Sequence, residues 1–215
     1  MPEHRQEFQG QLDAIETKVI ELFAVVAEDL SEATGALLRG DGQMAGLLAA
    51  REAIIDDLYH EIEQLAGREI ALEAPVASDL RFLLAVLRVV PELERSHHLI
   101  VEIASRADRV SKDDLSARSR EIVEQMGNVV TSMWRQAVDS WYQRDRSVAA
   151  VLSQRDDDMG DLHAQLIAEV STGRMPPYVT VEMTLVARFY KRLGDHAINV
   201  AQRVIYLAGL QHPPD

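Results

Sequence analysis

The chain has 215 residues and a formal charge of −13 at pH 7, from 22 basic and 35 acidic side chains. This acidity argues against nucleic-acid binding, because phosphates must be neutralised by Lys and Arg. Hydrophobic residues make up 47% of the chain and aromatic residues 5%, which excludes a disordered chain and favours helices over strands. The absence of cysteine excludes disulfides, Cys-ligated zinc and a thiol nucleophile.

The longest apolar stretch, residues 80–90, contains Arg81 and Arg88 and is shorter than the roughly 18 residues of a membrane-spanning helix. Residues 1–11 are polar and lack the apolar region of a secretory signal. We therefore expect a soluble, cytoplasmic protein with no membrane span.

Apolar residues of the first segment recur at alternating steps of three and four, which predicts one long helix with a single buried face. They are Phe8, Leu12, Ile15, Val19, Leu22, Val26, Leu30, Ala33 and Leu37. We expect Gly40 to end this helix and Asp41 to cap the second one. The second helix is predicted from about Gln43 to about Leu65, with its end near Gly67.

The third helix is predicted to begin at Pro75 or Ser78 and to end at about Arg106. Ser111 followed by Asp114 resembles a capping box, which predicts the start of the fourth helix.

Asp145 is the predicted cap of the fifth helix, which we expect to stop at Gly173. The sixth helix is predicted to follow Pro177 and to end at Gly209. The expected fold class is therefore all-α, with six long helices and no strand.

The six predicted helices form two similar sets of three. A shift of 104 residues places five residues of one half on identical or similar residues of the other: Asp41 on Asp145, Arg51 on Arg155, Glu52 on Asp156, Asp57 on Asp161 and Leu58 on Leu162. A shift of 97 residues places Glu94-Arg95 on Lys191-Arg192. A tandem duplication explains these matches and predicts two pseudo-symmetric three-helix bundles, residues 1–108 and 111–210, packed as one compact unit.

The second half contains a candidate cation site. Asp157 and Asp161 lie four residues apart on one helix face, and Asp195 is available from the next helix. Carboxylates on one face repel unless a hard cation lies between them, although a solvated acidic face explains the same pattern. Gly194 inside the last helix predicts the close approach of a neighbouring helix or of a ligand held by Asp195.

The first half has a different set of candidate ligands. Asp57 is present, but Ala53 stands four residues before it. Glu94, His98 and Glu102 lie four residues apart on the third helix, and carboxylate with imidazole suits a transition metal. A hydrated stripe with a Glu–His contact is the alternative.

A di-iron oxidase is a second hypothesis. Glu94-x-x-His97 and Asp57-x-x-His60 resemble the paired Glu-x-x-His motifs of ferritin-like bundles. This hypothesis uses only the first half and leaves the duplication unexplained.

Three segments resemble the PhoU family of phosphate-transport accessory regulators. They are residues 74–81 (APVASDLR), residues 92–95 (ELER) and residues 187–199, which contain AR and RLGDHAIN. The resemblance covers essentially the whole chain. It implies two three-helix bundles and a non-enzymatic role in which the protein represses the phosphate-starvation response when phosphate is plentiful.

The resemblance also implies partners and metal sites. The partners are the ATPase subunit of the phosphate ABC transporter and a sensor histidine kinase, with candidate docking residues Asp79, Arg81, Arg95 and Arg192. The implied metal ligands are Asp57, Glu94 and His98 in the first half and Asp157, Asp161 and Asp195 in the second. Both motifs are eroded, because Ala53 replaces an Asp of the family and Lys191 replaces a Glu.

We therefore expect a cytoplasmic phosphate-signalling regulator that reaches the inner face of the membrane through its partners and forms a homodimer. We expect no required cofactor and only weak or substoichiometric binding of a divalent or iron ion. The alternatives are the di-iron oxidase and a helical adaptor outside phosphate control.

Overall fold

The structure, a computed structural model, describes residues 2–145 and 147–208, and within these ranges it contains six long α-helices, two short 3₁₀ helices and no strand. The long helices are α1 (Pro2–Arg39), α2 (Gly42–Glu73), α3 (Ala77–Ala104), α4 (Ala117–Gln143), α5 (Val148–Val170) and α6 (Pro177–Leu207). The 3₁₀ helices are η1 (Ser105–Asp108) and η2 (Lys112–Asp114). The predicted all-α class is confirmed.

The predicted buried face of α1 is confirmed. Every residue of the stripe from Leu12 to Leu37 is buried, and Phe8 is half-buried. Gly40 ends the helix with φ +70°, a left-handed conformation that favours glycine. The Asp41 side chain then accepts a hydrogen bond from the Met44 amide at 3.1 Å and caps α2.

The predicted end of α2 near Gly67 is wrong, because the helix continues to Glu73. Gly67 faces open space, with no atom within 4 Å of an added Cβ, so it does not interrupt the packing. Ala66 and Glu69 on either side are buried. Tertiary packing of these turns outweighs the roughly 1 kcal/mol that a helical glycine costs.

The predicted starts of α4 and α5 are also wrong. Ser111 caps the short helix η2, and Ser116 caps α4 by accepting a hydrogen bond from the Ser119 amide at 2.9 Å. Helix α5 begins at Val148. In the turn before it, the Asp145 carboxylate accepts a hydrogen bond from the Ser147 amide at 2.8 Å. This hydrogen bond lowers the pKa of Asp145. The predicted end of the last helix at Gly209 lies outside the described residues.

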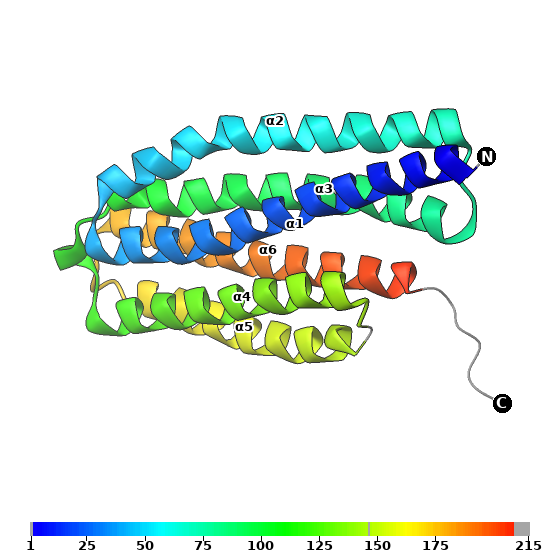
Figure 1. The fold of residues 1–215 in the computed structure, drawn as a ribbon. Helices are drawn as coiled ribbons and strands as arrows, with labels where there is room; N and C mark the ends of the chain where they lie inside the picture. The colour runs from blue at the N-terminus through cyan, green and yellow to red at the C-terminus, as the bar shows by residue number, and fades with distance from the viewer. Residues whose placement is uncertain (1, 146, 209–215) are drawn as a thin grey trace.

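The two halves lie side by side along one long axis (Figure 1). Within each half the outer helix, α2 or α5, packs on the two others. The halves meet through α1 against α4 and α3 against α6, so α2 and α5 form opposite edges of the molecule (Figure 1). Helices α3 and α6 run antiparallel, since Arg106 after the end of α3 is ion-paired with Glu182 near the start of α6 at 3.2 Å.

Aromatic and polar contacts join the halves in the interior. Phe23 of α1 packs against Trp134 and Trp141 of α4, with ring centroids 6.3 and 6.0 Å apart. The hydroxyls of Thr34 on α1 and Tyr190 on α6 are 2.8 Å apart, and burial raises the pKa of Tyr190. Among the described residues, every helix lacks the uninterrupted apolar length that a membrane span requires.

Candidate functional site

The acidic face of the second half contains a lysine. The Lys191 ammonium on α6 lies 2.5 Å from Asp156 Oδ1 on α5 and 2.9 Å from Asp195 Oδ1 on its own helix. Burial alone would lower the pKa of Lys191, but its hydrogen bonds with Asp156 and Asp195 raise the pKa above its ordinary value. A permanent cation thus joins the carboxylates of two helices.

The predicted ligands Asp157 and Asp161 are exposed on α5, and within the described residues neither makes an ion pair or hydrogen bond. Asp156, one residue before the predicted ligand, is the carboxylate that reaches α6. An ammonium group between carboxylates repels a metal cation, so the residues of this half do not fit a multinuclear metal cluster.

The first half has an imidazole–carboxylate pair at the equivalent place. His98 Nδ1 on α3 lies 2.8 Å from Glu52 Oε1 on α2, and both side chains are partly exposed. Ala53 and Asp57 are exposed, and Glu94 is half-buried. Within residues 2–145 and 147–208, no group of three or more His, Asp or Glu side chains is arranged to hold a metal ion.

A buried polar cluster lies beneath this face of the first half. Asp29 of α1 is fully buried, and its Oδ2 lies 3.0 Å from His97 Nε2 on α3. Asp29 also accepts a charge-assisted hydrogen bond from Arg51 of α2. The cluster therefore joins all three helices of the half, and His97 Nδ1 is buried with no hydrogen-bond partner among the described residues.

The two motifs of the di-iron hypothesis are separated by this cluster. His97 is buried against Asp29, whereas His60 is exposed and its Nδ1 lies 2.7 Å from the Asp56 carbonyl oxygen. One histidine therefore faces the interior and the other faces solvent, which does not match a shared centre.

A second polar cluster lies where α3 meets α6. The Ser96 hydroxyl donates to the Glu92 carbonyl oxygen at 2.6 Å and lies 2.8 Å from His196 Nδ1. His196 Nε2 is 3.8 Å from the Glu92 carboxylate. Burial lowers the pKa of His196, with Glu92 acting in the opposite direction and Arg192 and Arg95 in the same direction. The predicted docking residues Arg95 and Arg192 thus flank one histidine at the boundary between the halves.

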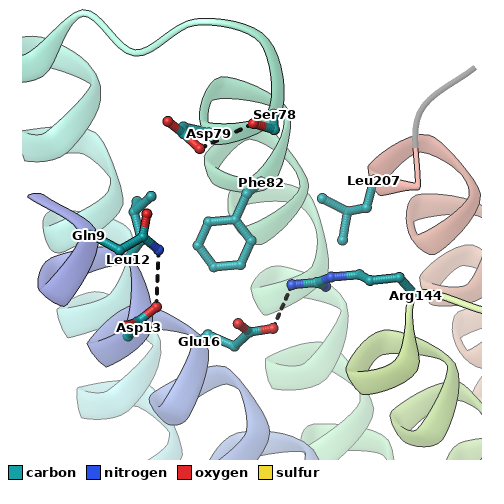
Figure 2. A pocket seen from close by; sticks show the side chains of 9 residues that line it. All are labelled: Gln9, Leu12, Asp13, Glu16, Ser78, Asp79, Phe82, Arg144 and Leu207. Carbon is teal, nitrogen blue, oxygen red and sulfur yellow. Dashed lines mark hydrogen bonds and ion pairs between the residues drawn. The ribbon is translucent and has the colours of Figure 1, made fainter. Parts of the chain in front are cut away.

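A cavity of about 220 Å³ opens at the end of the bundle where α1, α3, α4 and α6 meet. Figure 2 shows the Phe82 ring between Asp79 on one side and Arg144 on the other, with Asp13 and Glu16 below. Asp79 accepts a hydrogen bond from Ser78 at 3.3 Å. The predicted docking residue Asp79 therefore lines this cavity.

Arg144 has a left-handed backbone, with φ 56°, where its repeat equivalent is Gly40. A non-glycine residue in this region is strained unless its surroundings hold it. Arg144 is held by an ion pair with Glu16 at 2.5 Å and by contacts with the rings of Phe82 and Trp141, 5.7 and 5.2 Å from their centroids. Arg144 thus connects the α4–α5 joint to α1 of the other half.

Arg81, the remaining docking candidate, is half-buried, and its Nε has no hydrogen-bond partner among the described residues. Asp29 and Arg144 are not among the residues predicted from the sequence. A signal existed for Asp29, because it lies at helical spacing between Val26 and Ala33 on the buried stripe. For Arg144, alignment of the two halves placed it on Gly40.

The family model described as PhoU domain matches residues 19–107 and 123–204, once in each half. A PhoU homologue of Clostridium acetobutylicum, named as a phosphate-specific transport system accessory protein, is 28% identical over 208 residues and covers 94% of each chain. The PhoU homologue 2 of Mycobacterium tuberculosis, also named as a phosphate-specific transport system accessory protein, is 30% identical over 209 residues, covering 95% of this chain and 97% of that one.

Solved structures resemble the fold over nearly its full length. The crystal structure of PhoU from Pseudomonas aeruginosa matches with a TM-score of 0.86 and 26% identity, covering 93% of this chain and 98% of that chain. The phosphate transport system regulatory protein PhoU from Streptococcus pneumoniae also has a TM-score of 0.86, with 24% identity and coverage of 97% and 100%.

Proposed function

The chain belongs to the PhoU family, and from this premise we propose that it is a regulatory accessory protein of a phosphate transport system. The observation that carries the proposal is the family match in both halves, at 19–107 and 123–204. Relatives similar over nearly the whole chain, whose names state a phosphate-specific transport accessory role, support it.

In this proposal the protein binds the ATPase subunit of the phosphate ABC transporter and a sensor histidine kinase, and represses the phosphate regulon when phosphate is plentiful. It acts by differential binding: the transporter or kinase state that it binds more tightly is the state that it stabilises. Neither catalysis nor a required cofactor enters this mechanism. We further propose that it is a cytoplasmic homodimer that reaches the membrane only through its partners.

The metal ligands Asp57, Glu94, His98, Asp157, Asp161 and Asp195 remain proposed sites for weak or substoichiometric ion binding. The Lys191 contacts with Asp156 and Asp195 support weak binding in the second half, because the ammonium already neutralises part of the carboxylate charge. Metal analysis of the purified protein tests this proposal.

Deletion of the gene in the source organism tests the proposed function. We expect phosphate-starvation genes to be expressed in high phosphate, and repression to return when the wild-type gene is restored. Continued repression in a strain without a close paralogue would contradict the proposal. A pull-down from cells grown in high and low phosphate, recovering neither the ATPase subunit nor the kinase, would favour an adaptor outside phosphate control.

A further inference from the structure

Arginines follow the solvent side of α3 at steps of seven residues. Arg81, Arg88 and Arg95 therefore lie on one side of the helix, about 10.5 Å apart along its axis. Arg88 and Arg95 are exposed. This side borders α6, because Glu92 and Ser96 on the adjacent part of the helix surface are the residues that approach His196.

Helix α6 contributes arginines to the same boundary. Arg192 is exposed one turn before His196, close enough to act with Arg95 on the pKa of that histidine. Arg203 is half-buried seven residues after His196. Because α3 and α6 run antiparallel, Arg203 lies toward the end of the boundary at which Arg88 is found. We call Arg88, Arg95, Arg192 and Arg203 the arginine seam.

The charge of the arginine seam is largely uncompensated. Arg88, Arg192 and Arg203 make no ion pair or hydrogen bond within the part of the chain that the structure describes. Arg95 is paired with Glu92 at 2.8 Å. The planar donors of a guanidinium group fit carboxylates in particular.

Carboxylates border the arginine seam on both sides. On the α2 side, Glu52 pairs with His98 of α3. On the α5 side, Asp156 of α5 and Asp195 of α6 pair with Lys191. A broad anionic surface would meet these carboxylates as well as the arginines, whereas a single helix presents a charged face only about 10 Å wide.

We propose that the arginine seam is a docking surface for an acidic helix of a partner protein, an inference that rests on the proposed regulatory function. Carboxylates seven residues apart on such a helix match the spacing of Arg88 and Arg95 along α3. Arg192 and Arg203 supply the arginines on the α6 side of the arginine seam.

The test compares two charge-reversed proteins against the purified ATPase subunit and the purified cytoplasmic part of the kinase. Arg88→Glu/Arg192→Glu reverses two unpaired seam arginines, and Arg135→Glu/Arg174→Glu reverses two exposed arginines outside the seam. We expect the first variant to bind one partner at least about 10-fold more weakly than wild type, and the second to stay within about twofold. Wild-type binding should weaken with rising salt.

If wild type binds a partner and the seam variant binds it equally well, the arginine seam is not the docking surface, while the proposed function stands. If wild type binds neither partner, the proposed function fails and the docking proposal fails with it. Phosphatidylglycerol vesicles and inorganic phosphate serve as competing probes. Loss of binding to either probe in the seam variant, with partner binding unchanged, would overturn the proposal.

If Arg88→Glu/Arg192→Glu fails to fold, Arg88→Gln/Arg192→Gln replaces it, because this variant removes charge without adding carboxylates.

Cross-linking of the wild-type protein to its partner identifies the acidic residues of the partner that lie on the seam. Lys substitutions of those residues should restore binding to Arg88→Glu/Arg192→Glu, and a failure of this rescue would contradict the proposed pairing.

Discussion

Where Asp29 of α1 meets His97 of α3 in the first half, the second half has Met133 of α4 beside Gly194 of α6. These positions are equivalent, by shifts of 104 residues for the first helix and 97 for the third. One half thus contains a buried carboxylate paired with imidazole and guanidinium, and the other contains a thioether that fills the space beside a glycine.

This comparison shows that the same three-helix frame tolerates opposite interior chemistry. A buried charge loses its hydration and is stabilised only while all its partners are present, whereas apolar packing carries no such requirement. The first half therefore depends on three side chains from three helices acting together. The second half depends instead on how well the Met133 side chain fits beside Gly194.

Asp29→Ala should give the largest loss of stability, because it leaves His97 and the Arg51 guanidinium without their shared acceptor. We expect the free energy of unfolding to fall by about 3–5 kcal/mol, measured by urea denaturation. Asp139→Ala, at an exposed position of α4, is the control and should change stability by less than about 0.5 kcal/mol. A loss below about 1 kcal/mol for Asp29→Ala would contradict the dependence of the first half on its buried polar cluster.

The double variant Asp29→Met/His97→Ala replaces the buried polar pair of the first half with apolar side chains similar to those of the second half. We expect this double variant to be more stable than Asp29→Ala by about 1–2 kcal/mol, because it leaves no buried polar group unpaired. Arg51 can turn to solvent, since its side chain is already 38% exposed. A double variant less stable than Asp29→Ala would show that the first-half frame requires the polar cluster.

Two glycines of the second half should respond oppositely to the same substitution. A Cβ at Gly127 would lie 2.5 Å from Thr34 Cγ2, so Gly127→Ala should destabilise by about 1–3 kcal/mol. A Cβ at Gly194 would meet Met133 Sδ at 3.6 Å, an ordinary contact, so Gly194→Ala should stabilise by about 0.5–1 kcal/mol. Thermal melts of both variants check the signs, and destabilisation by Gly194→Ala would mean that the glycine is needed for close packing.

The boundary between the halves should weaken in mild acid. Burial lowers the pKa of His196 in the folded protein, so the folded state keeps this histidine neutral where the unfolded state already binds a proton. Its contribution to stability is present above about pH 6.5 and is lost as the pH falls through that value toward the folded pKa. Urea midpoints at pH 8, 7, 6 and 5 should fall less steeply for His196→Gln than for wild type. Parallel curves would contradict this prediction.

Lys191→Glu should have a clear effect on metal binding. It replaces the ammonium between Asp156 and Asp195 with a further carboxylate, so bound Mn²⁺ or Fe²⁺ should rise from substoichiometric levels to about one ion or more per chain. Elemental analysis after desalting measures this, with Lys191→Gln as the matched neutral control. Equal metal content in the two variants, or stoichiometric metal in wild type, would contradict it.

The helices themselves were largely predictable. The stripe from Leu12 to Leu37, the stop at Gly40 and the cap at Asp41 depend on residues within one or two turns of each other, which a sequence displays directly. The predicted helix boundaries were wrong where tertiary packing, or a second capping residue nearby, competed with the local sequence pattern. Gly67 lies inside a helix stabilised by its neighbours, and Ser116 rather than Ser111 begins α4.

The contacts of the candidate site were less predictable, because they depend on the rotation and register of packed helices. Along an α-helix, the side chains of consecutive residues point in directions about 100° apart around the helix axis. Asp156 rather than Asp157 therefore meets Lys191, and the neighbours His97 and His98 lie in the interior and in solvent. The sequence by itself determined the all-α class, the duplication and the family, since these follow from local periodicity and repeated motifs. Only the tertiary structure decided which carboxylates meet which cations and which arginines remain free, because these pairings arise between helices far apart in the chain.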